Sequence, residues 1–79
     1  MIIAKLMYVT GRKENYTPIA RQKIGYTFEL TKIIPKESAI LRQINSECTI
    51  LTSIIESIEI TKENITVISK NTKYLFKML

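Results

Sequence analysis

The sequence predicts an all-β domain, a small SH3-like or OB-like barrel of six or seven short strands with one short helix at most. Of the 79 residues, 26 are the β-branched Ile, Thr and Val, whereas Ala, the best helix former, occurs three times. Apolar and polar residues alternate along several short segments, and no helical segment of about ten residues separates them. A chain of this length forms one domain, 1–79, and buries only about 60% of its unfolded surface.

The amino-terminal part holds one strand and one long connection. Apolar residues on both sides of segment 2–9 predict a mostly buried strand, with Tyr8 on the same side as Leu6. Apolar residues in segment 11–23 follow neither a helical nor a strand period, which indicates a long loop with room for one helical turn. Loops of more than about 12 residues are uncommon in compact domains and often functional, so a binding site is expected here.

The middle of the chain begins with the clearest alternation, over residues 24–30, which ends before Pro35. Its inward positions are Ile24, Tyr26, Phe28 and Leu30. Segments 39–44 and 48–52 predict two further strands joined at 45–47. A helix over 37–47 remains the alternative, because the apolar residues also approximate a helical stripe.

The carboxyl-terminal part predicts three strands, at 54–60, 65–69 and 72–78. The last two form a hairpin around Lys70 and Asn71, where Asn71 is able to take a left-handed turn conformation at little cost. On the last strand one side carries Tyr74, Phe76 and Met78, and the other carries Lys73, Leu75 and Lys77.

Composition removes most familiar catalytic chemistry. The chain has one cysteine and no histidine, which excludes an internal disulfide, a Cys/His zinc site and a histidine-based triad or dyad. Cys48 is interpreted as a buried apolar residue, because no cation stands beside it in sequence. Glu56 and Glu59 share a face only on a helix, so they make no acid/base pair on a strand. We therefore expect no enzyme activity, no catalytic residue, no metal and no cofactor.

The sequence contains no run of about 18 uncharged apolar residues. Its start, residues 1–6, has no basic region ahead of a long apolar run and no small-residue cleavage site, so it does not have the pattern of a signal peptide. We expect a cytoplasmic protein that is not inserted in a membrane.

Charge is distributed unevenly along the chain. The net charge is +5 over residues 1–36, −3 over 37–69 and +3 over 70–79. If the first and last strands pair, Lys5, Lys73 and Lys77 join the cations of the long loop on a neighbouring surface. Such a surface attracts anions.

The candidate binding site is the basic loop. Its members are Arg12, Lys13, Tyr16, Arg21 and Lys23. Cations beside an exposed aromatic ring are typical of nucleic-acid and nucleotide sites, because the ring stacks on a base while the cations neutralise phosphates. Tyr26 is interpreted as a core residue, so Tyr16 is the stacking candidate.

The carboxyl-terminal third resembles a recurrent ending of small phage-encoded and mobile-element β proteins. The likeness is carried by a Thr-Ser step at Thr52 and Ser53 that leads into a strand, then by a hairpin whose second strand follows Asn71 and carries Tyr74 and Phe76. The resemblance implies a phage-like origin, a location in the host cytoplasm, and action by binding and blocking a host component.

Three functions fit these observations. The first is a non-enzymatic counter-defence protein that binds a host defence protein or an anionic component, such as a nuclease's nucleic-acid channel or a nucleotide signal. The second is a β-barrel that binds DNA or RNA directly, and the third is a structural or assembly protein. A homo-oligomer is expected with each, because the chain has 15 isoleucines and limited capacity to bury them.

Overall fold

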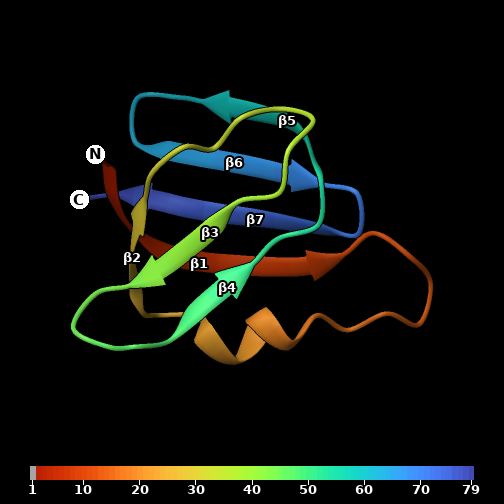
Figure 1. The fold of residues 1–79 in the computed structure, drawn as a ribbon, viewed down its shortest axis with the longest axis horizontal. Coiled ribbons are helices and arrows are strands. Elements are labelled where there is room, and N and C mark those ends of the chain that lie inside the picture. Colours follow the sequence, from red (N-terminus) through yellow and green to blue (C-terminus); the bar gives the residue numbers. More distant parts are fainter. Residues whose placement is uncertain (1) are drawn as a thin grey trace.

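The fold is taken from a computed structural model, which describes residues 2–79 (Figure 1). In chain order the strands are β1 (Ile2–Gly11), β2 (Thr27–Leu30), β3 (Ile40–Gln43), β4 (Thr49–Leu51), β5 (Ile55–Ile60), β6 (Asn64–Ser69) and β7 (Thr72–Met78). A short 3-10 helix, η1 (Ile19–Lys23), lies between β1 and β2. All seven strands belong to one antiparallel sheet in the order β4-β3-β2-β1-β7-β6-β5. The all-β prediction is confirmed, with one helical turn in the long connection.

The sheet consists of two meanders, β1 to β4 and β5 to β7, which join because β7 pairs with β1. The two edge strands, β4 and β5, do not pair with each other in the described chain. At one end the connection after β2 closes the seam instead. Lys36 N–H donates to Ile55 C=O at 2.7 Å, and Ile55 N–H donates to Glu37 C=O at 2.9 Å. The result is a curled sheet around one core, closed by a loop at one end and open at the other.

The core lies on the concave side of the sheet. Alternation places Tyr74 and Phe76 of β7 inside, as expected, and the rings of Phe28 and Phe76 meet edge to face at a centroid distance of 6.3 Å. The buried apolar residues are Ala4, Leu6, Val9, Ala20, Phe28, Leu30, Ala39, Leu41, Ile55, Ile65, Val67, Tyr74 and Phe76. No helix of the described chain has the length and apolar character needed to cross a bilayer.

A β-bulge changes the expected faces of β1. The register to β7 shifts between Leu6 and Tyr8, so that one extra residue, Met7, is inserted. Beyond the bulge Val9 is buried, while Tyr8 is 54% exposed. The placement of Tyr8 on the inner side was wrong, because a period of two holds only while the register is unbroken.

The strand predicted over 24–30 begins later, at Thr27. Gly25 has a φ of +98°, a turn conformation that separates η1 from β2. Two main-chain bonds fix this turn to β1, from Gly25 N–H to Leu6 C=O and from Leu6 N–H to Tyr26 C=O. Ile24 and Tyr26 consequently lie at the surface, with Tyr26 51% exposed, which corrects their assignment to the core.

The β3–β4 hairpin confirms two strands in place of a helix over 37–47. Its turn contains Asn45 at a φ of 60°, and Cys48 lies exposed just before β4. The expected burial of Cys48 was therefore wrong. Asn71 does not use the left-handed conformation open to it, since its φ is not positive.

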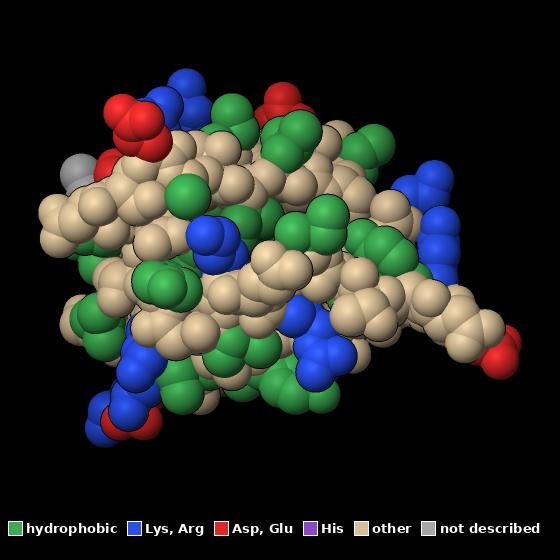
Figure 2. Space-filling view, turned by 90° about the horizontal axis from the view of Figure 1, so that it is seen from below, with side chains coloured by type: hydrophobic (Ala, Val, Ile, Leu, Met, Phe, Trp, Pro, Cys, Tyr) green, Lys and Arg blue, Asp and Glu red, His purple; other side chains and the backbone are tan. Residues whose placement is uncertain are grey.

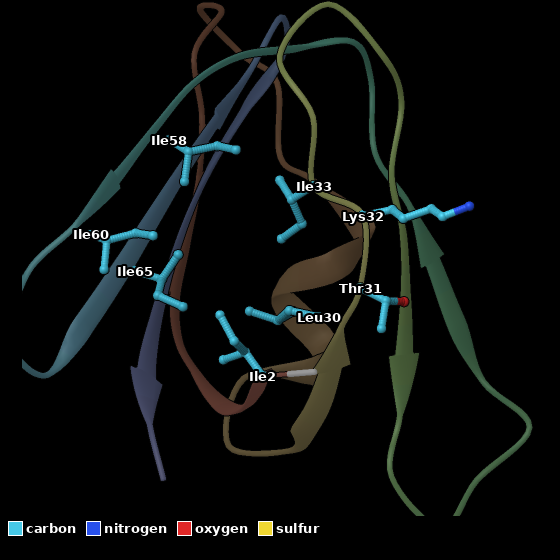
Figure 3. Close-up of a pocket in the computed structure, with 8 residues that line it drawn as sticks. All are labelled: Ile2, Leu30, Thr31, Lys32, Ile33, Ile58, Ile60 and Ile65. Atoms are coloured by element: carbon cyan, nitrogen blue, oxygen red, sulfur yellow. The ribbon is translucent and has the colours of Figure 1, made fainter.

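The two ends of the curled sheet present different surfaces. Figure 2 shows the face on the side of η1, where Lys and Arg side chains stand among apolar ones and acidic side chains lie toward the rim. The open part of the seam forms an apolar groove of about 470 Å³ (Figure 3). Its lining residues are Ile2, Leu30, Thr31, Lys32, Ile33, Ile58, Ile60 and Ile65.

Candidate functional site

Three lysines lie on the outer face of the pair formed by β1 and β7. Burial of Tyr74 and Phe76 leaves Lys73 and Lys77 on the other side of β7, and the register places Lys5 of β1 directly opposite Lys77. All three lysines are exposed. We call Lys5, Lys73 and Lys77 the lysine face.

The lysine face carries charge that no acidic side chain offsets by direct contact. The ion pair of the described chain joins Arg12 and Glu56, and none involves Lys5, Lys73 or Lys77. Like charges directly opposite each other on paired strands destabilise a sheet. An arrangement of this kind attracts an anion, which relieves the repulsion when it binds.

The bulge adds an aromatic ring to the lysine face. Along the ladder Lys5 faces Lys77, Tyr8 faces Leu75, and Thr10 faces Lys73. Because directly opposed residues share a face, Tyr8 lies between the lysine pair at one end and Lys73 at the other. An exposed ring interleaved with cations can stack on a base while the cations neutralise phosphates.

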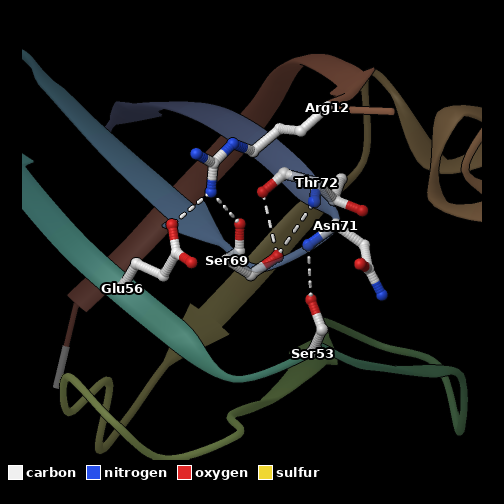
Figure 4. A network of polar contacts seen from close by, with 6 residues as sticks. All are labelled: Arg12, Ser53, Glu56, Ser69, Asn71 and Thr72. Atoms are coloured by element: carbon white, nitrogen blue, oxygen red, sulfur yellow. Dashed lines mark hydrogen bonds and ion pairs between the residues drawn. The ribbon is translucent and has the colours of Figure 1, made fainter. Parts of the chain in front are cut away.

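Of the predicted loop residues, Arg12 has a side chain that is held in place by contacts with other strands (Figure 4). Its guanidinium Nη1 pairs with the Glu56 carboxylate and donates to the Ser69 carbonyl at 2.7 Å. Its backbone N–H donates to the Asn71 carbonyl at 2.9 Å. These contacts connect the end of β1 to β5 and to the β6–β7 turn, so Arg12 fixes the start of the basic loop.

Serine and threonine hydroxyls complete this polar network. The Ser69 hydroxyl accepts the Thr72 N–H at 3.2 Å and donates to the Thr72 carbonyl at 2.9 Å. Ser53 Oγ accepts the Asn71 N–H at 3.1 Å (Figure 4), and Thr52 Oγ1 accepts the Ala39 N–H at 2.9 Å. The Thr-Ser step before β5 therefore satisfies main-chain donors of two neighbouring loops.

Lys13 and Tyr16 lie in the exposed part of the loop. Tyr16 N–H donates to Lys13 C=O at 3.2 Å, and Asn15 between them has a φ of 60°. The turn packs closely on the end of β1, because a Cβ atom at Gly11 would lie 2.2 Å from the Tyr16 carbonyl oxygen. Gly11 is thus required for this loop path.

Arg21 and Lys23 belong to η1, which Ala20 anchors in the core. The Lys23 ammonium lies 5.5 Å from the centroid of the Tyr26 ring, a cation–π distance. Tyr26 is thus an aromatic partner of a loop cation. The alternation of apolar residues over 24–30 had predicted Tyr26 in the core. The Gly-Tyr dipeptide before β2 was the available signal, because glycine favours a turn.

Cys48 lies near the same cation. A hydrogen bond from Ser46 and then the positive charge of Lys23 lower the pKa of the Cys48 thiol. The sequence showed no cation beside Cys48, because Lys23 reaches it only through the fold.

The structure thus separates the candidate cations into two groups, one on η1 and its loop and one on the lysine face. No group of three His, Cys, Asp or Glu side chains suited to a metal ion occurs within residues 2–79. No protein-family model, no curated protein and no solved structure matches this chain.

Proposed function

We propose that this protein is a non-enzymatic binding protein whose lysine face, with Tyr8, takes an anionic ligand that contains bases, a nucleotide or a single-stranded nucleic acid. The observation that carries the proposal is the bulge in β1, which brings Tyr8 to the outer face between Lys73 and the opposed pair Lys5 and Lys77. The ring supplies a stacking surface and the lysines supply charge for phosphates.

The basic loop extends this surface in the proposal. Lys13, Tyr16, Arg21 and Lys23 contact the anionic partner, while Arg12 holds the loop in place through Glu56 and Ser69. The exposed position of Tyr16 and the pairing of Lys23 with Tyr26 support this division. Arg12 is therefore assigned a positioning role.

The biological setting follows from the resemblance of the carboxyl-terminal third. A phage-type protein of this kind sequesters an anionic host component, such as a nucleotide signal, or blocks a host defence protein, in the host cytoplasm. Direct binding to DNA or RNA is the second candidate, which the same lysines and tyrosine favour. Preference for a mononucleotide or dinucleotide over an oligonucleotide separates the two.

The test uses two variants that lose the same charge. One replaces Lys5, Lys73 and Lys77 with Ser, and the other replaces Lys13, Arg21 and Lys23 with Ser. Binding of fluorescent oligothymidylate is measured by anisotropy over a range of salt. If each lysine of the face contacts a phosphate, the first variant lowers the salt slope by about two units. An unchanged slope in the first variant contradicts the lysine face, and loss only in the second assigns binding to the loop.

Self-association belongs to the same proposal. Ile3 and Met7 of β1 remain exposed on the outer side of a small domain, which supports it. Sedimentation of the samples used for binding checks this, and a single 9.1 kDa species at all concentrations contradicts it.

A further inference from the structure

β5 is an edge strand whose main chain has free hydrogen-bonding groups. Thr61 N–H donates to Asn64 C=O at 2.9 Å, which closes the β5–β6 hairpin with a hydrogen-bonded pair. Antiparallel pairs alternate between hydrogen-bonded and non-hydrogen-bonded. The register therefore places Ile60 and Ile58 at non-hydrogen-bonded positions, so their N–H and C=O groups point away from β6.

The first part of this edge is already paired with another segment of the chain, the connection after β2. Ile55 donates to Glu37 and accepts from Lys36 through its outward main-chain groups. Among residues 2–79 no other main-chain segment forms a hydrogen bond to the outward groups of Ile58 or Ile60. The edge is closed at Ile55 and open beyond it.

The open part of the edge borders the apolar groove. Ile58 and Ile60 point into the groove from one side, and Leu30 and Ile33 point toward them from the other (Figure 3). Ile60 is 62% exposed. The side chain of Lys32 extends away from these residues (Figure 3), so the space between them is lined by hydrocarbon. The groove thus fits an apolar side chain, and the edge fits an extended main chain.

The negative charge of β5 favours a basic partner strand over a second copy of this chain. The charged side chains of β5 are both acidic, and within residues 2–79 only Glu56 of the two has an ion-pair partner. A second copy paired with β5 across a two-fold axis brings the two Glu59 side chains directly opposite or diagonal to each other, which is unfavourable. A strand with Lys or Arg opposite Glu59 gains an attractive pair at the same place.

We propose that β5 binds an extended segment of a partner protein by strand addition. The segment pairs with the main chain of Ile58 and Ile60, places alternate apolar side chains in the groove, and places Lys or Arg beside Glu59. This site goes beyond the proposed function and is distinct from the lysine face.

The probe is a capped seven-residue peptide in which Ile and Lys alternate, added to ¹⁵N-labelled protein. The amide signals of Ile58 and Ile60 are expected to shift, and their exchange with solvent is expected to slow. The substitution Glu59→Lys is expected to weaken binding about fivefold. The matched control Glu47→Lys changes the same charge in the β3–β4 turn and is expected to leave binding unchanged.

Four results overturn the proposal. They are shifts confined to other strands, equal binding by Glu59→Lys, equal binding by a peptide with N-methylated main chain, and a peptide-free dimer that protects Ile58 and Ile60. The last result makes a second copy the occupant. The variant with Lys5, Lys73 and Lys77 replaced by Ser is expected to bind the peptide normally, so this site and the proposed anion site fail or succeed separately.

Discussion

The substitution Lys77→Glu is expected to stabilise the protein while weakening anion binding. Lys77 lies opposite Lys5 on the outer face, both are exposed, and neither has an ion-pair partner in the described chain. The change converts a like-charge cross-strand pair into an opposite-charge pair. Stability and ligand binding should therefore move in opposite directions.

The size of the effect follows from the geometry of the pair. Opposite charges directly across an antiparallel pair contribute about 0.2–1 kcal/mol, and like charges cost a similar amount. Because the substitution removes one and adds the other, the free energy of unfolding should rise by about 1 kcal/mol. For a chain of this size that corresponds to an increase of about 4–8 °C in Tm.

Urea unfolding at low salt measures the change, and the same series at about 1 M salt should remove most of it, because both charges are exposed. The control Lys70→Glu makes the same change of net charge in the β6–β7 turn, outside the ladder. An equal gain in both variants shows that only the net charge matters. No gain in Lys77→Glu, or a gain with unchanged oligonucleotide binding, refutes the reasoning.

Three further predictions concern the polar network, the loop and the thiol. Arg12→Ala should lower the free energy of unfolding by about 1–2 kcal/mol in urea titrations, because a charge-assisted bond to the Ser69 carbonyl and a half-exposed ion pair are lost; equal stability would contradict its positioning role. Gly11→Ala should cost about 1–3 kcal/mol, because its Cβ meets the Tyr16 carbonyl, and an unchanged denaturation midpoint would argue against this loop path. Alkylation of Cys48 by iodoacetamide should reach half its maximal rate at a lower pH than a free cysteine does, and Ser46→Ala and Lys23→Ala should each move that pH upward; an unmoved profile in both variants would exclude these causes.

The elements that the sequence predicted well are those with an unbroken period. β7 alternates from Thr72 to Met78 without interruption, and its burial follows the predicted faces. The β3–β4 hairpin was also predictable, because β-branched residues in its second half disfavour the competing helix.

The errors arose where a single residue breaks the period. Met7 adds a residue to β1 and moves Tyr8 outward, and Gly25 turns the chain before β2 and leaves Tyr26 exposed. A bulge of this kind does not change the local composition enough to be recognised in one sequence. Gly25 was a turn signal, but the apolar alternation over residues 24–30 outweighed it.

The candidate site was predicted only in part for a different reason. The pairing of the first and last strands, on which the expected lysine surface depended, does occur and brings Lys5 opposite Lys77. The contacts of Arg12 with Glu56, and the position of Lys23 near Cys48, join residues far apart in the chain. Such contacts depend on the relative placement of strands, which composition and periodicity do not specify.

The most direct test of the central claim is an NMR titration of the protein with oligothymidylate, following the ring protons of all four tyrosines and the side-chain signals of the lysines. Upfield shifts of the Tyr8 ring are expected, because the ring stacks on a base, together with shifts of Lys5, Lys73 and Lys77. A saturable titration in which Tyr8 and these three lysines do not shift would contradict it, as would the absence of any saturable change at low salt.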